Sequence, residues 1–170
     1  GNHKGRWGWF DVEQQWLPAP GDLQARKDFV RFVVDLVRKA REESHRVDGV
    51  VLPELALDYA LFRRLARALA SEADVDFLIS GLSDIRDGRR GNFVAIAPFF
   101  LIEKDMERTR GLDQLFLIRE KHHRWKLTRD QIKVYGLGKA LPLKRSWWEH
   151  LELLGRSLDL FVYRGGTSLT

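Results

Sequence analysis

Cysteine is absent from all 170 residues of the chain. Its absence excludes disulfides, thiolate zinc sites and a cysteine nucleophile from this stretch. No run approaches the roughly 18 consecutive apolar residues of a membrane-spanning helix. The basic first residues lead into no apolar segment of the kind that follows in a signal peptide. Missing cysteines record no redox compartment, but these absences together lead us to expect a cytoplasmic protein without a membrane partner.

The composition is that of an ordinary soluble domain, with 44% hydrophobic and 31% charged residues. Its length suits one domain over residues 1–170. The formal net charge of +5 weakly favours anionic partners. The densest basic cluster covers residues 119–126 and includes Trp125. Cations beside a stacking aromatic predict a nucleic-acid patch there, and a solvated basic surface is the alternative.

Hydrophobic periodicity predicts helices and strands in alternation. Residues 23–43 and 58–72 have apolar positions at helical spacing, with Asp22 as a cap for the first, and shorter helices are expected at 128–135 and 147–154. Apolar runs predict strands over 48–52, 75–80, 92–100, 115–121 and 158–163. A strand running into a loop is expected over 7–17, a loop over 103–111, and a further strand from Ser168. This order is typical of an α/β layered sheet with helices packed on it.

Glu54 is the residue in which chemistry is first expected. It follows Pro53 at the carboxyl end of the apolar run 48–52, which lacks alternation and therefore predicts a strand buried on both faces. Ligands bind at this edge of open α/β sheets. Partial shielding from water would raise the pKa of Glu54 towards the range of a general base. The alternative is that Glu54 only caps the helix beginning near Asp58.

Four short motifs occur in order along residues 48–127. They are the strand Gly-Val-Val-Leu-Pro-Glu ending at Glu54, Phe77-Leu-Ile-Ser-Gly-Leu82, Gly91-Asn92-Phe-Val-Ala-Ile96 and Lys121-His-His123. Each motif alone is weak, but in this order they are specific. The chain resembles the front part of a nitrilase-like domain, the carbon–nitrogen hydrolase superfamily.

The resemblance implies an αββα sandwich and a triad of glutamate, lysine and cysteine. Glu54 would take the thiol proton and deliver it to the leaving amine, and Lys121 would stabilise the oxyanion. The cysteine would form a thioester with a small amide or nitrile substrate, and because this chain has none it is expected beyond Thr170. A solvated surface lysine is the alternative for Lys121.

The resemblance also implies further site residues and partners. Asn92, His123 and Arg124 are expected to contribute to binding, with no cofactor and no metal, and a homo-oligomer is left open. Because neighbouring strand residues point to opposite faces, His122 and His123 are not expected to share one ion.

The sequence also departs from the family pattern. Arg119 stands where members usually have an aromatic, and Asp130 and Gln131 stand where many place a second glutamate in a Gly-Glu step. The substrate-positioning carboxylate is therefore not identified. The stretch from Lys121 to Gln131 looks closer to a divergent branch, the nitrilase-like domains that accompany bacterial reverse transcriptases in phage defence. The second hypothesis is therefore a non-catalytic nitrilase-like module that binds a protein or nucleic acid.

Overall fold

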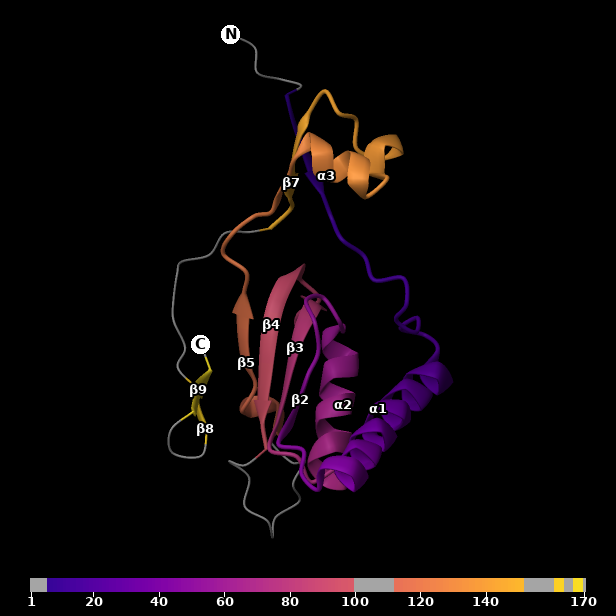
Figure 1. Ribbon diagram of the computed structural model, residues 1–170, viewed down its shortest axis with the longest axis vertical. Helices are drawn as coiled ribbons and strands as arrows, with labels where there is room; N and C mark the ends of the chain where they lie inside the picture. Colours follow the sequence, from indigo (N-terminus) through magenta and orange to yellow (C-terminus); the bar gives the residue numbers. More distant parts are fainter. Residues whose placement is uncertain (1–5, 100–111, 152–160, 164–166, 170) are drawn as a thin grey trace.

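The computed structural model describes residues 6–99, 112–151, 161–163 and 167–169. Its larger sheet has four strands in the order β2-β3-β4-β5, with β2 and β3 parallel and the other neighbours antiparallel. Two helices pack side by side on one face of this sheet (Figure 1). These elements are β2 (Gly49–Val51), β3 (Phe77–Asp84), β4 (Arg90–Pro98), β5 (Leu117–Glu120), α1 (Leu23–Ser44) and α2 (Tyr59–Glu72).

Both long helices begin at an aspartate. The Asp22 carboxylate accepts a hydrogen bond from the Ala25 backbone N–H at 2.9 Å, and Asp58 accepts one from Leu61 at 2.8 Å. Such caps satisfy backbone donors that a helix leaves unpaired at its first turn. Arg26, buried on α1, donates to both oxygens of Asp58 and so joins the two helices. The sequence predictions for both helices and for the Asp22 cap are confirmed.

The main hydrophobic core lies between the helices and the larger sheet. Leucines and Phe62 of α2 meet the side chains of β3 and β4 that point to the same face. Its fully enclosed members include Leu61, Phe62, Leu65, Leu69, Leu78 and Leu82. Burial of each large apolar side chain contributes about 1.5–3 kcal/mol, so this cluster fixes β3 and β4 against α2.

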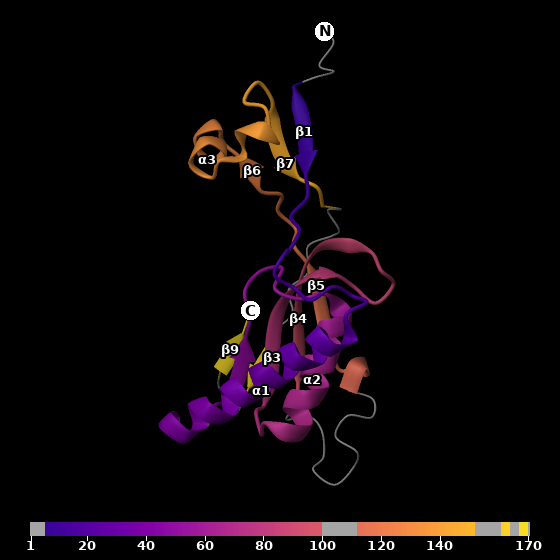
Figure 2. The same ribbon diagram turned by 90° about the vertical axis from the view of Figure 1, so that its right-hand side faces the viewer.

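A second, smaller sheet lies beyond one end of the larger one (Figures 1 and 2). Its strands run in the order β1-β7-β6, and α3 packs on one face through Phe10, Leu127, Ile132 and Trp147. Strands β8 and β9 form an antiparallel hairpin on the side of the larger sheet opposite α1 and α2 (Figure 1). The bounds are β1 (Trp7–Phe10), β6 (Lys126–Leu127), β7 (Ser146–Glu149), β8 (Phe161–Tyr163), β9 (Thr167–Leu169), α3 (Arg129–Val134) and the short 3-10 turns η1 (Leu112–Gln114) and η2 (Leu137–Lys139).

The helix predicted over 147–154 is wrong where the structure describes it. Residues Ser146–Glu149 form β7, parallel to β1 and antiparallel to β6. Trp147 and Glu149 are buried on one face, while Trp148 points to the other. Burial alternating at every second residue is a strand pattern, and a strand partner from the start of the chain supplies the hydrogen bonds. The strand running into a loop that was predicted over 7–17 is confirmed, and its strand part, β1, ends at Phe10.

The strand predicted to be buried on both faces is an edge strand with one open face. Val51 is 67% exposed because α1 and α2 cover only the opposite face. In register across the sheet, Val51, Ile79, Ile96 and Leu117 form an apolar row on the open side. The α/β class is confirmed. The predicted loop 103–111 lies outside the described residues, and no helix in the described part of the chain is long and apolar enough to span a membrane.

Candidate active site

The loop that carries Glu54 is fastened along β3. The Gly81 N–H donates to the Pro53 carbonyl at 3.1 Å, and the Leu57 N–H donates to the Gly81 carbonyl at 3.1 Å. A Cβ on Gly81 would lie 2.3 Å from the Leu55 nitrogen and 2.5 Å from the Glu54 Cα, closer than real Cβ contacts occur. Glycine is therefore required at position 81 for the Glu54 loop to lie this near the strand.

The turn after Glu54 depends on an unusual backbone conformation. Leu55 has φ 55°, in the left-handed region that non-glycine residues rarely adopt, and its side chain is buried. Such strain persists only where the surroundings hold it and is often found at functional sites. The turn buries Leu55 while leaving the Glu54 side chain 60% exposed.

Asn92 and Lys121 are brought together by the sheet. The backbone N–H of Lys121 donates to the backbone carbonyl of Asn92 at 2.8 Å, and this bond continues the pairing of β4 with β5. The Lys121 ammonium then lies 2.8 Å from Glu54 Oε1, and the Asn92 amide nitrogen lies 2.7 Å from the same oxygen. The prediction that Glu54 and Lys121 lie close together is confirmed, and Asn92 lies beside them.

Glu149 completes the cluster and was missed by the sequence analysis. Its side chain is 6% exposed and accepts hydrogen bonds from Lys121 Nζ at 2.9 Å, Asn92 Nδ2 at 2.7 Å and the Trp125 N–H at 3.1 Å. The Asn92 amide thus donates to both carboxylates. The signal that could have found Glu149 is its place two residues after Trp147, since alternate positions of one strand share a face.

Asp130 and Gln131, at the positions where the resemblance would place a second glutamate, have other roles. Thr128 and Gln131 form a capping box at the start of α3, in which each side chain bonds the backbone of the other. Asp130 is exposed in the first turn of the same helix. The carboxylate therefore comes from β7 and not from the segment just after Lys121.

The site's electrostatics correct the prediction made for Glu54. The Lys121 hydrogen bond, followed by the Asn92 hydrogen bond, lowers the pKa of Glu54, and the burial that would raise it is outweighed. Burial pulls the pKa of Lys121 down, but the hydrogen bonds that its ammonium donates to Glu54 and Glu149 outweigh burial, and the net direction is up. Glu54 is therefore an ionised carboxylate and Lys121 an ammonium at neutral pH. The capping alternative for Glu54 fails, because Asp58 caps α2.

His123 and Arg124 have their contacts away from the carboxylates. Arg124 donates through Nε and Nη2 to the Leu151 carbonyl at 3.2 and 2.8 Å, and its guanidinium lies over the Trp9 ring. His122 and His123 lie outside any strand, with ring centroids 4.5 Å apart, so the prediction that they point to opposite faces is wrong. Both line a separate hollow beside the tryptophans of β1.

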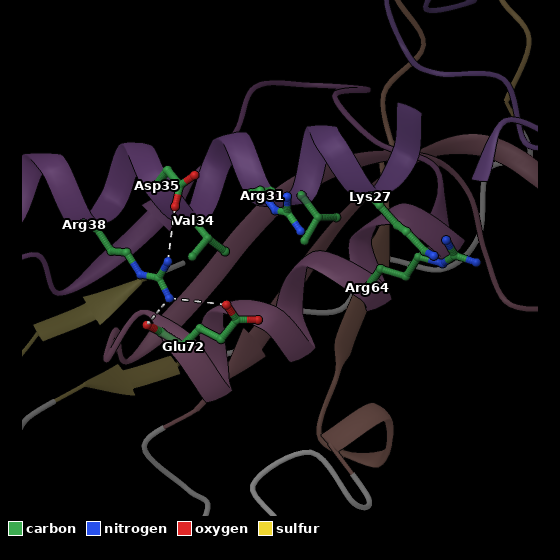
Figure 3. A pocket seen from close by; sticks show the side chains of 8 residues that line it. Lys27, Arg31, Val34, Asp35, Arg38, Arg64 and Glu72 are labelled. Carbon is green, nitrogen blue, oxygen red and sulfur yellow. Dashed lines mark hydrogen bonds and ion pairs between the residues drawn. The ribbon is translucent and has the colours of Figure 1, made fainter. Parts of the chain in front are cut away.

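Two further hollows are lined by described residues. One of about 300 Å³ lies beside the site and is lined by Asn92 and Glu149 together with Leu55, Ser83 and Arg89. Another, of about 440 Å³, lies between α1 and α2, where Lys27, Arg31 and Arg64 gather and Arg38 pairs with Asp35 and Glu72 (Figure 3). Among the described residues no group of three or more side chains is arranged to hold a metal ion.

Comparisons with protein-family models, curated proteins and solved structures found no match to this chain.

Proposed function

We propose that the protein is a carbon–nitrogen hydrolase acting on a small amide or nitrile, with Glu54 as general base and Lys121 as oxyanion stabiliser. The cysteine nucleophile would lie beyond Thr170, as the resemblance implies. The observation that carries the proposal is the contact of 2.8 Å between Lys121 Nζ and Glu54 Oε1, made between residues from separate motifs. A base and a cation at one point are what acyl transfer to a thiol requires.

Glu54 is suited to receive a proton. Both of its hydrogen bonds fall on Oε1, and within the described part of the chain Oε2 has no hydrogen-bond partner. Oε2 would take the thiol proton as sulfur attacks the carbonyl carbon. The same proton would pass to the amine nitrogen as the carbon–nitrogen bond breaks and a thioester forms, which water then hydrolyses. Substrate binding would displace water and raise the pKa of Glu54, which strengthens it as a base.

Lys121 is suited to bind the oxyanion. An ammonium has three N–H donors, and two of them are directed to Glu54 and Glu149. The third is available, within the described residues, for the oxygen of a tetrahedral intermediate. Glu149 would fix the ammonium through a buried contact, and Asn92 would bridge the two carboxylates by donating to both.

We infer further that the larger sheet is one layer of an αββα sandwich. The apolar row of Val51, Ile79, Ile96 and Leu117 supports this, because helices cover the opposite face and this face exposes Val51 and Leu117. A contiguous apolar surface of this kind marks a place where another layer packs. A second sheet or a second protomer would bury it.

The alternative is a non-catalytic module in which the same charges are structural. It is favoured by one observation, the absence of any cysteine from the chain's 170 residues. Ion-pair networks also perturb pKa values where no reaction occurs. The two hypotheses differ in the effect on hydrolysis that each predicts when the Glu54 charge is removed.

The test uses the full-length protein and the variant Glu54→Gln, which keeps the shape and removes the base. Ammonia release from a panel of small aliphatic amides and nitriles should fall about 10²- to 10⁴-fold. The matched control is Glu72→Gln, an exposed glutamate on α2 that pairs with Arg38, and it should retain activity within a few-fold. Activity of Glu54→Gln within a few-fold of wild type, or no cysteine in the residues that follow Thr170, would refute the proposal.

A further inference from the structure

The smaller sheet presents indole rings on the face opposite α3. Trp7 and Trp9 stand two residues apart on β1 and are 57% and 52% exposed. Trp148 of β7 is the register partner of Trp9 and lies in a stacked contact with Trp7, with ring centroids 6.1 Å apart. The inner face is the one that packs Phe10 and Trp147 against α3. Three tryptophans therefore share the outer face of one small sheet.

Cations lie among these rings. The Arg124 guanidinium carbon is 4.9 Å from the centroid of Trp9, and the Lys126 ammonium is 5.1 Å from that of Trp148. A hollow of about 380 Å³ is lined by Trp7, Trp9, His122, His123, Arg124 and Trp148. None of these six lining residues is acidic. The surface therefore combines flat aromatic faces with positive charge that no carboxylate of the hollow neutralises.

The chemistry of this face selects its ligand. Exposed indoles favour a partner with flat rings, and the cations favour one with negative charges at short intervals. A neutral sugar would need carboxylate or amide side chains for its hydroxyl groups, and the lining of the hollow has none. A membrane surface would be met by aliphatic side chains as well as tryptophan. Duplex DNA keeps its base faces stacked away from such rings.

We propose that the outer face of β1-β7-β6 binds single-stranded nucleic acid. Trp7 and Trp9 stack on bases, and Lys126 contacts the phosphate backbone, with Arg124 holding the Trp9 ring and adding positive charge beside it. Base stacking on aromatic side chains tolerates any sequence, so the site recognises a single strand and not a particular base order. The proposal is independent of the hydrolase proposal, since it uses none of Glu54, Lys121 or Glu149.

The test measures binding of a fluorescein-labelled oligothymidylate of about 12 nucleotides to the full-length protein by anisotropy. Trp9→Ala and Trp7→Ala should each weaken binding by about tenfold, within the range of one lost base stack. Trp9→Phe should retain most of the affinity, because phenylalanine also stacks. The logarithm of the association constant falls as the logarithm of the salt concentration rises. Lys126→Ala should make this slope less steep by about 0.7, the value for one single-strand phosphate contact.

The double variant Lys27→Ala/Arg31→Ala is the matched control. It removes two cations from the hollow between α1 and α2, which has no tryptophan in its lining (Figure 3). It should leave affinity within about twofold, and circular dichroism should show every variant folded.

Any one of the following results would overturn the proposal. They are no binding of the oligonucleotide at low salt, equal affinity for a duplex of the same length, Trp9→Ala binding as wild type does, and a control loss as large as that of Trp9→Ala. Binding to phosphatidylserine vesicles without binding to the oligonucleotide would assign the face to a membrane surface and would also overturn it.

Discussion

Replacing Lys121 with methionine should destabilise the protein by leaving the Glu149 carboxylate without its cation. Methionine has a similar length and no charge, so the change removes the ammonium with little change in packing. Glu149 is 6% exposed, and after the substitution it would retain only the neutral donors Asn92 Nδ2 at 2.7 Å and the Trp125 N–H at 3.1 Å. A buried charge held by neutral donors alone is poorly compensated.

The magnitude follows from burial. Removing one partner of a fully buried ion pair costs about 3–5 kcal/mol. The Lys121 side chain is 31% exposed, so water can enter the space it leaves, and the low end of that range applies. We therefore expect about 3 kcal/mol at neutral pH. Adding Glu149→Gln removes the stranded charge, so the double variant should cost less than the sum of the single variants by about 1–3 kcal/mol.

The cost should depend on pH through Glu54. In the wild type the pKa of Glu54 is lowered, chiefly by its hydrogen bond to Lys121. The unfolded chain then binds more protons in the acid range, so stability rises with pH through that window and is lost as pH falls through the folded pKa. Lys121→Met removes the main cause of the lowered value. The difference between wild type and variant should therefore be smaller near pH 3 than near pH 7.

The assay is urea unfolding followed by circular dichroism at both pH values, with Lys39→Met on the exposed side of α1 as the control. An exposed substitution away from such contacts should stay within about 0.5 kcal/mol. A Lys121→Met cost no larger than that of the control, or a double variant whose cost equals the sum of its parts, would refute the reasoning.

The other predictions concern positions that support the site. Gly81→Ala should destabilise the protein by about 2 kcal/mol or more, since its Cβ would meet the backbone of the Glu54 loop 2.5 Å from the Glu54 Cα. It should also lower the hydrolysis that we propose for the full-length protein. Thermal unfolding and ammonia release would check both effects, and wild-type behaviour in both would contradict the prediction. Arg26→Met should cost about 3 kcal/mol at neutral pH and less below about pH 4, because the pKa of Asp58 is raised by burial but more strongly lowered by Arg26 and other hydrogen bonds. Urea unfolding at the two pH values would test that order. Thr128→Ala should cost about 1 kcal/mol by removing the cap of α3, and Thr128→Ser, measured alongside it, should recover most of the loss.

The sequence alone predicted the elements whose signals are local. The first helix was expected over 23–43 with Asp22 as its cap, and α1 runs Leu23–Ser44 with that cap in place. Periodicity and capping depend on residues within one or two turns of each other, so neighbouring positions suffice to read them. The strands that end near Glu54 and Lys121 were predicted from apolar runs, which are also local signals.

The strand β7 and the role of Glu149 could not be read locally. A run of four residues fits either a helical turn or a short strand, and the choice here is made by pairing with β1 from the start of the chain. The expected helix hid the alternation that buries Trp147 and Glu149 together. The same limit applies to the pKa of Glu54, whose direction is set by Lys121, 67 positions away, and Asn92, 38 positions away.

The two carboxylates of the site are chemically alike, and their surroundings give them different capacities. Glu149 is buried and receives three hydrogen bonds, which engage both of its oxygens. Glu54 is 60% exposed and receives its bonds on one oxygen. Different surroundings can give two chemically similar carboxylates different acid–base roles within one site. A mutation that freed Glu149 would therefore not replace Glu54 as the base that we propose, because the buried oxygen would face Asn92, Lys121 and Trp125 and not the open side where the proposed nucleophile would enter.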